Sequence, residues 1–247
     1  MTAWLFHGFT GSGPDWDPLL QRLPAIGDVW APSLIPDQGD RGPLPFESLD
    51  AASEALAARP TEPADVVGYS MGGRLALTFA VVAPDRVRSL VLIGASPGLA
   101  DPQERAARTA SDEALAARVE QVGTAAFADY WETVPILASQ ARIEPGVLAG
   151  LRRRRRARSA SATAAVLRGW GAGAMRPLHA DLARLDVPVL LVTGEDDPKF
   201  RAIADDMAAA LPRAERFDVP GAGHTAHLER PVIVARRLAA FLATVRS

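Results

Sequence analysis

Short apolar runs alternate with amphipathic segments through most of the chain. An unbroken apolar run is typical of a strand buried on both faces, whereas apolar residues spaced three and four apart indicate a helix. Strand-like runs lie at residues 4–6, 29–32, 65–69, 87–94, 187–193 and 215–219. Helical spacing follows them at residues 14–23, 47–59, after Ser70, at 203–211 and from 231 onward. This alternation predicts a mostly parallel sheet with helices on both faces.

Residues 101–173 interrupt the alternation. This segment has no strand-like run and consists of alanine-rich helical stretches that are broken near Gly123, Pro135, Pro145 and Gly169. We interpret residues 99–173 as a helical cap inserted into a core made of residues 1–98 and 174–247. A cap at this point is expected to cover the functional site and to set substrate choice.

The pattern G-x-S-x-G occurs where the strand at 65–69 turns into a helix. Gly68 and Gly72 flank Ser70 at two residues' distance, which leaves room for a strained turn that lifts the serine hydroxyl above the sheet. The pattern alone is weak, but the strand before it and the helix after it favour a nucleophile elbow. A phosphate-binding loop is disfavoured, because no Gly-Lys-Ser/Thr follows. We therefore predict that Ser70 is the nucleophile or base.

Two further strand ends carry the residue types that a reactive serine needs. His224 follows the strand at 215–219 and would accept the serine proton, while a buried carboxylate would orient its imidazole. Asp197, after the strand at 187–193, is our choice for that carboxylate, with the adjacent Asp196 as the alternative. His227 is the alternative to His224. The order Ser, Asp, His is the one expected of an α/β-hydrolase fold.

A glycine-rich loop follows the first strand, at residues 7–13. Such a loop can direct a backbone N–H into the site, so the N–H groups of Phe9 and Met71 are expected to form an oxyanion hole. We expect His7 to order this loop rather than to take part in the chemistry.

Composition narrows the class of protein. The 247 residues are 48% hydrophobic, enough for one large α/β domain with an insertion, and the net charge of −2 does not favour nucleic acid or an anionic membrane as a partner. The absence of cysteine excludes disulfides, thiolate zinc sites and a cysteine nucleophile. Neither a signal peptide nor an apolar run long enough to span a bilayer is evident, so we expect a cytoplasmic protein.

Several segments together resemble one branch of the α/β-hydrolases. They are similar to the 2-succinyl-6-hydroxy-2,4-cyclohexadiene-1-carboxylate (SHCHC) synthases of menaquinone biosynthesis. The segments that carry this resemblance are residues 7–12 (HGFTGS), 68–74 (GYSMGGR), 127–139 (FADYWETVPILAS), 167–173 (LRGWGAG), 194–201 (GEDDPKFR) and 221–227 (GAGHTAH).

The resemblance implies an elimination rather than a hydrolysis. In that family the triad serine, activated by histidine, removes a proton next to a ketone, and pyruvate leaves as the ring becomes a diene. The oxyanion hole would then stabilise an enolate-like charge. The resemblance implies a small-molecule substrate with several carboxylates, no metal or organic cofactor, and a monomer or small homo-oligomer.

A polycarboxylate substrate directs attention to arginine, whose guanidinium suits bidentate carboxylate binding. Arg74 lies one helical turn after Ser70 and can point into the same pocket. The resemblance suggests substrate-binding roles for Arg118 and for Arg155, with Arg152 as the alternative within the run 152–156. The pocket could also be lined by two aromatic residues, Tyr69 and Trp131.

Two other functions are compatible with the same residues. An esterase, thioesterase or carbon–carbon-bond hydrolase would use Ser70 to form an acyl-enzyme, because one fold supports both chemistries. A binding protein that has lost catalysis is the third alternative, and the presence of Ser70, Asp197 and His224 weighs against it.

Overall fold

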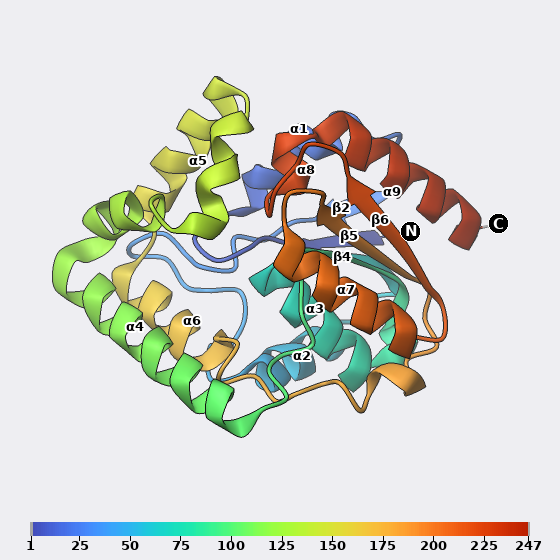
Figure 1. Ribbon diagram of the computed structural model, residues 1–247, viewed down its shortest axis with the longest axis horizontal. Helices are drawn as coiled ribbons and strands as arrows, with labels where there is room; N and C mark the ends of the chain where they lie inside the picture. Colours follow the sequence, from blue (N-terminus) through green and yellow to red (C-terminus); the bar gives the residue numbers. More distant parts are fainter. Residues whose placement is uncertain (1, 247) are drawn as a thin grey trace.

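The computed structural model describes residues 2–246, and within them a six-stranded parallel sheet forms the centre (Figure 1). The strands lie side by side in the order β2-β1-β3-β4-β5-β6. Their apolar, often β-branched residues suit strands covered on both sides. The bounds are β1 Thr2–Phe6, β2 Asp28–Trp30, β3 Ala64–Tyr69, β4 Val87–Ile93, β5 Val189–Gly194 and β6 Ala214–Val219.

Alternating side chains of β1, β3, β4 and β5 belong to two separate cores, one on each face of the sheet. On β1, Trp4 and Phe6 belong to the core that includes residues of α2, α3 and α7, whereas Ala3 and Leu5 belong to the core on the opposite face, with residues of α1 and α9. The first set of helices is α2 Leu49–Ala57, α3 Met71–Val82 and α7 Pro198–Ala210. The second is α1 Asp17–Leu20, α8 Ala226–Glu229 and α9 Pro231–Arg246. The predicted sheet with helices on both faces is confirmed.

Between β4 and β5 the described chain forms only helices and connecting segments. Figure 1 shows α4 (Pro102–Trp131), α5 (Pro145–Ala157) and α6 (Ala160–Trp170) together at one side of the molecule. They have a small core of their own, in which Phe127 of α4 packs with Ala164 and Leu167 of α6. Within α4 the backbone breaks at Gly123, where φ is 76°, a conformation that favours glycine. We call residues 102–170 the cap.

The strand order creates a crevice at β1. The chain leaves β1 toward β2 on one side and returns through β3 on the other, so the helices that follow β1 and β3 cover opposite faces. In an open parallel sheet, ligand-binding groups gather at such a switch point, beyond the carboxyl ends of the strands. The loop at 7–13 and Ser70 both lie there.

Two local features differ from the expectation. The predicted helix 14–23 is a 3₁₀ turn, Gly13–Trp16, followed by the short α1. Pro18 has no N–H to donate to the carbonyl of Pro14, which accepts from Asp17 instead, and Pro24 disfavours helical backbone at Leu23. The helix α8 was not predicted, since it is only one turn long and lies inside the glycine-rich segment around His224. Three more 3₁₀ segments occur at Pro84–Arg86, Pro135–Arg142 and Leu182–Arg184. Over residues 2–246, no helix is both long and apolar enough to cross a membrane.

The carboxylate of Asp65 connects three segments at the end of the sheet remote from the crevice. It accepts hydrogen bonds from Arg88 on β4 (Nη2 to Oδ2, 2.8 Å), from Ser89 (Oγ to Oδ1, 2.7 Å) and from Arg246 on α9. Burial raises the pKa of this carboxyl, but the hydrogen bonds outweigh it and hold the pKa below its ordinary value of 3.8. Asp65 therefore holds the last helix against the sheet.

Substitution Asp65→Asn is expected to lower the free energy of unfolding by about 3 kcal/mol at pH 7, because two guanidinium groups lose their carboxylate. A folded-state pKa below the unfolded value stabilises the protein above pH 3.8, and this contribution disappears as the pH falls through the lower folded pKa. Urea unfolding at pH 7 and near pH 3 should thus show the difference from wild type shrinking in acid. Asp40→Asn, at an exposed position, is the control. Equal stabilities of the two variants at pH 7 would contradict this role.

Candidate active site

Ser70 sits on a strained turn between β3 and α3. Its φ of 50° and ψ of −109° lie outside the regions that side-chain-bearing residues favour. A Cβ atom on Gly68 would lie 2.4 Å from the carbonyl oxygen of Gly72, and one on Gly72 would lie 2.1 Å from that of Phe6. Only glycine fits at either position. The turn is therefore wedged against the end of β1, with the serine hydroxyl above the sheet.

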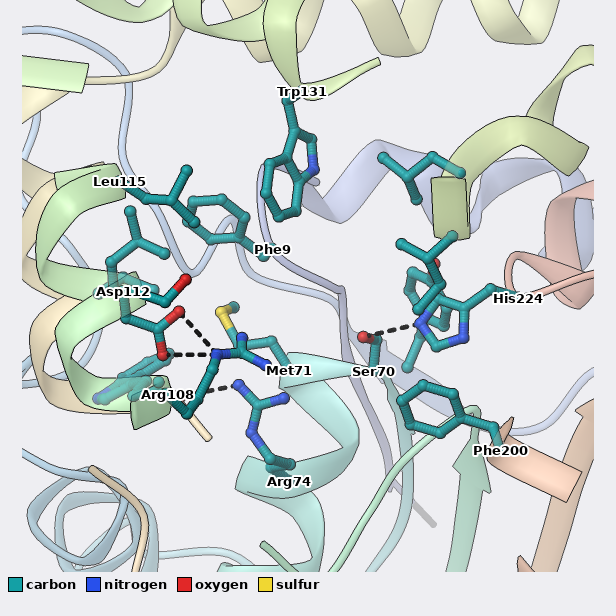
Figure 2. A pocket seen from close by; sticks show the side chains of 18 of the residues that line it. Phe9, Ser70, Met71, Arg74, Arg108, Asp112, Leu115, Trp131, Phe200 and His224 are labelled. Atoms are coloured by element: carbon teal, nitrogen blue, oxygen red, sulfur yellow. Dashed lines mark hydrogen bonds and ion pairs between the residues drawn. The ribbon is translucent and has the colours of Figure 1, made fainter. Parts of the chain in front are cut away.

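The structure brings Ser70, His224 and Asp197 into one hydrogen-bonded chain. Nε2 of His224 lies 3.1 Å from Oγ of Ser70, and Nδ1 lies 2.7 Å from Oδ2 of Asp197 (Figure 2 shows the serine–histidine contact). The other oxygen of Asp197 accepts the N–H of Phe200 and caps α7, while the Phe200 ring packs on the imidazole at 4.4 Å. This is the arrangement in which a histidine can take a serine proton while a carboxylate fixes its tautomer.

The two alternatives weighed from the sequence lie elsewhere. The side chain of Asp196 is exposed and pairs with Arg142 of the cap. His227 is buried between Trp16 and Tyr69, at ring distances of 4.8 and 4.5 Å. Burial lowers the pKa of His227 to about 3, so it stays neutral. Neither residue contacts Ser70 in the described structure.

His7 holds the loop that follows β1. Its Nε2 accepts the N–H of Leu34 (2.7 Å), so the proton is on Nδ1, which donates to the carbonyl of Gly8 (2.8 Å). Burial lowers the pKa of His7 to about 4. This neutral histidine fixes the loop on which Phe9 lies. Phe9 and Met71 both line the cavity at Ser70, as their expected oxyanion-hole role requires.

The core and the cap enclose a cavity of about 300 Å³ between them. Ser70 and His224 lie at one end, and a charged cluster lies at the other (Figure 2). Tyr69 and Trp131 line it, as predicted, and the ring of Trp131 meets that of Phe9 edge-on at 5.0 Å. The lining residues used below are Phe9, Tyr69, Ser70, Met71, Arg74, Arg108, Asp112, Trp131, Lys199, Phe200 and His224.

The charged cluster consists of Arg74, Arg108 and Asp112. Arg74 donates through Nη2 to the carbonyl of Trp170 (2.8 Å), while its buried Nε has no partner in the described structure. Nε of Arg108 lies 2.9 Å from both carboxylate oxygens of Asp112. Burial, reinforced by repulsion from Arg108, lowers the pKa of Arg74 to about 10. Among the described residues that line the cavity, Arg74, Arg108 and Lys199 are cationic and Asp112 is a carboxylate. This excess of positive charge suits an anionic ligand.

The other arginines predicted to bind substrate lie in different environments: two are exposed and one is buried. Arg118, expected at the pocket, is exposed on α4 and lies over the ring of Tyr130, 3.9 Å from its centre. Arg152 is also exposed and pairs with Glu132. Arg155 is 5% exposed and lines a smaller cavity behind Tyr69, where its Nε and Nη1 have no hydrogen-bond partner.

The expectation for Arg118 thus does not match its position, and Arg108 occupies the pocket instead. Arg108 and Arg118 are ten residues apart, which at about 100° per residue puts them on different faces of α4. Arg108 was not predicted from the sequence. Its only signal was the helical spacing of four to Asp112, a pair that the cap could equally have placed in solvent.

Three comparisons with known proteins show the family and the fold of this chain. A family model described as "alpha/beta hydrolase fold" matches residues 5–231. A Bacillus subtilis (strain 168) protein, provisionally named as an SHCHC synthase, is 36% identical over 245 residues, 97% of this chain and 89% of that protein. The SHCHC synthase of Enterobacter sp. (strain 638) is 32% identical over 245 residues, 97% of this chain and 91% of its own.

A solved structure extends the likeness to three dimensions. The chain is similar to MenH from S. aureus with a TM-score of 0.93 and 26% sequence identity, covering all of this chain and 95% of the other. The similarity therefore includes the cap as well as the sheet.

His7 and His227 should not titrate between pH 8 and pH 5, because burial holds both imidazoles in the neutral form, with pKa values of about 4 and 3. Nitrogen-15 NMR of the imidazole rings across this range would show their shifts unchanged. The variants His7→Gln and His227→Gln assign the two signals. A titration midpoint above pH 5.5 for either ring would contradict the structure.

Proposed function

The chain belongs to the α/β-hydrolase fold family and, within it, to the SHCHC synthases, and we propose that it eliminates pyruvate from 2-succinyl-5-enolpyruvyl-6-hydroxy-3-cyclohexene-1-carboxylate. The observation that supports this most is a single cavity with the Ser70–His224 pair at one end and two arginines at the other. The binding of a neutral ester would not require this positive charge. A substrate with several carboxylates would be bound by it.

In the proposed reaction, Ser70 and His224 together act as the base. Ser70 Oγ accepts the proton on ring carbon 2, next to the succinyl ketone, as its own proton moves to Nε2 of His224. The electron pair forms a 2,3 double bond, the 3,4 double bond moves to 4,5, and the bond from carbon 5 to the enolpyruvyl oxygen breaks. The released enolpyruvate becomes pyruvate by taking up a proton. Asp197 stabilises the imidazolium that forms meanwhile.

The remaining groups would bind and stabilise the charged species. The N–H groups of Phe9 and Met71 would stabilise the negative charge that develops on the ketone oxygen. Arg74 and Arg108 would bind a substrate carboxylate, and Arg108 takes the role expected for Arg118. Arg155, whose Nε has no hydrogen-bond partner and whose Nη1 lies 3.8 Å from Oε1 of Glu132, would bind another. Burial raises the pKa of Tyr69, so its phenol remains a hydrogen-bond donor.

Ser70→Ala is expected to reduce pyruvate release by at least about 1,000-fold, because the histidine loses the group that it activates. Coupled pyruvate detection and the absorbance of the conjugated diene measure the reaction. Ser161→Ala, an exposed serine on α6, is the control. Turnover equal to that of wild type would refute the proposed base. Cleavage of p-nitrophenyl esters without pyruvate release would instead favour a serine esterase on this fold.

Arg74→Ala and Arg108→Ala are each expected to lower kcat/KM for the tricarboxylate substrate by about 10- to 100-fold, the cost of a charged hydrogen bond. Their effect on a neutral ester should be small. Arg168→Ala is the matched control, because this cap arginine pairs with Glu113 and Glu120 on the surface. Equal losses on the anionic and neutral substrates would contradict carboxylate binding. A loss in Arg118→Ala as large as in Arg108→Ala would contradict the choice between these two.

A further inference from the structure

Glu229 is a buried carboxylate that the proposed reaction does not use. It lies at the end of α8 and is 4% exposed, although ionised carboxylates are rarely buried without a compensating charge. Three neutral donors approach it: the N–H of Gly223 (2.7 Å to Oε2), the N–H of Thr225 (3.1 Å to Oε1) and the hydroxyl of Ser139 (2.8 Å to Oε1). These are the hydrogen bonds that compensate its burial.

The donors show what this carboxylate does. Gly223 and Thr225 are the residues on either side of His224, so one side chain binds the backbone immediately before and immediately after the proposed base. Hydrogen bonds to a charged acceptor are about twice as strong as neutral ones. Each ring nitrogen of His224 makes one hydrogen bond, Nδ1 with Asp197 and Nε2 with Ser70. Both bonds require the backbone of His224 to stay in a fixed position relative to these two residues.

Ser139 connects the same carboxylate to the cap. It lies in the 3₁₀ segment Pro135–Arg142, and its hydroxyl reaches Glu229 past Gly223. A Cβ atom on Gly223 would lie 2.3 Å from Oγ of Ser139, so glycine is required for this approach. The next residue, Gln140, donates to Oγ1 of Thr225 (3.0 Å) and accepts from Nη2 of Arg155 (2.9 Å). The cap therefore contacts both neighbours of His224.

We propose that Glu229 is a positioning residue, which fixes His224 through the backbone N–H groups of its two neighbours and, through Ser139, makes that position depend on the contact with the cap. This inference rests on the proposed role of His224 as the base, but not on the identity of the substrate. Binding energy at the cap would thereby be used to align the base with Ser70.

The variant Glu229→Gln tests the proposal with little change in shape. A glutamine has one acceptor oxygen, so at least one flanking amide loses its partner. We expect kcat to fall about 100-fold, the effect of a displacement of about 1 Å, while KM changes less than about threefold. Glu195→Gln is the matched control: Glu195 is exposed and accepts the N–H of Gly221 on the same loop. A fall in thermal stability with unchanged kcat would mean a merely structural role and would overturn the proposal.

Proton NMR provides a measurement that needs no substrate. The short bond from Nδ1 of His224 to Asp197 is expected to give a far-downfield proton resonance, assigned by its loss in His224→Gln. It should shift or broaden in Glu229→Gln and stay in place in Glu195→Gln. An unchanged resonance in Glu229→Gln overturns the proposal even if the enzyme releases pyruvate. If wild type releases no pyruvate, the proposed function fails, and the resonance still decides the role of Glu229.

Ser139→Ala tests the connection to the cap and remains available if Glu229→Gln does not fold. It removes one of the three hydrogen bonds and leaves both backbone bonds in place. We expect kcat to fall about tenfold, as for one hydrogen bond to a charged group, with a smaller shift of the same resonance. Wild-type kcat together with a wild-type resonance would overturn the connection between the cap and the base.

Discussion

The strained backbone at Ser70 is the constraint on which the rest of the structure depends. A side-chain-bearing residue at φ 50° costs of the order of 1–3 kcal/mol and persists only where its surroundings enforce it. Here the turn is wedged between β3 and the end of β1, with Gly72 against the carbonyl of Phe6. That contact exists because β1 and β3 are neighbours in the sheet. The strand order and the strained turn therefore require one another, and together they place a hydroxyl at the switch point.

Around this point, the core and the cap make different contributions. The groups proposed for proton transfer come from the ends of β3, β5 and β6. The cationic groups are divided between the cap, with Arg108 on α4 and Arg155 on α5, and the core, with Arg74 on α3 and Lys199 on α7. Arg74 also connects the two parts, because it donates to the carbonyl of Trp170. Three of the four histidines contribute to the site differently: His224 faces Ser70, whereas His7 and His227 are buried neutral and serve packing and loop order.

Much of the architecture could be predicted from local patterns in the sequence. Apolar runs predicted all six strands to within two residues at either end, and for the central strands the reason is that a parallel strand buried on both faces consists almost entirely of apolar residues. The elbow could be predicted because the strand, the serine and both glycines are close together in the sequence, although the contact that requires glycine at position 72 is made by Phe6 of β1. The choice between Asp196 and Asp197 could not be predicted, since neighbouring side chains at a strand end diverge, one toward Arg142 and one toward His224.

Arg108 was not predicted because α4 is polar around most of its surface, so no local pattern indicates which side of the helix faces the core. Glu229 was missed because its partners lie on a loop and on the cap. The roles of all these residues in catalysis remain predictions.

The insertion of the cap between adjacent strands affects how the chain folds. β4 and β5 pair side by side, yet residues 94–188 separate them, so their pairing closes a long loop whose entropic cost must be met before the contacts form. During synthesis, the first four strands and the Ser70 turn emerge well before residue 224 does, and domains generally begin to fold from the N-terminal side. The nascent chain thus carries its strained serine without its histidine until the last strand and the last helix have docked. The order of the elements therefore means that the proposed pair of Ser70 and His224 is completed only at the end of synthesis.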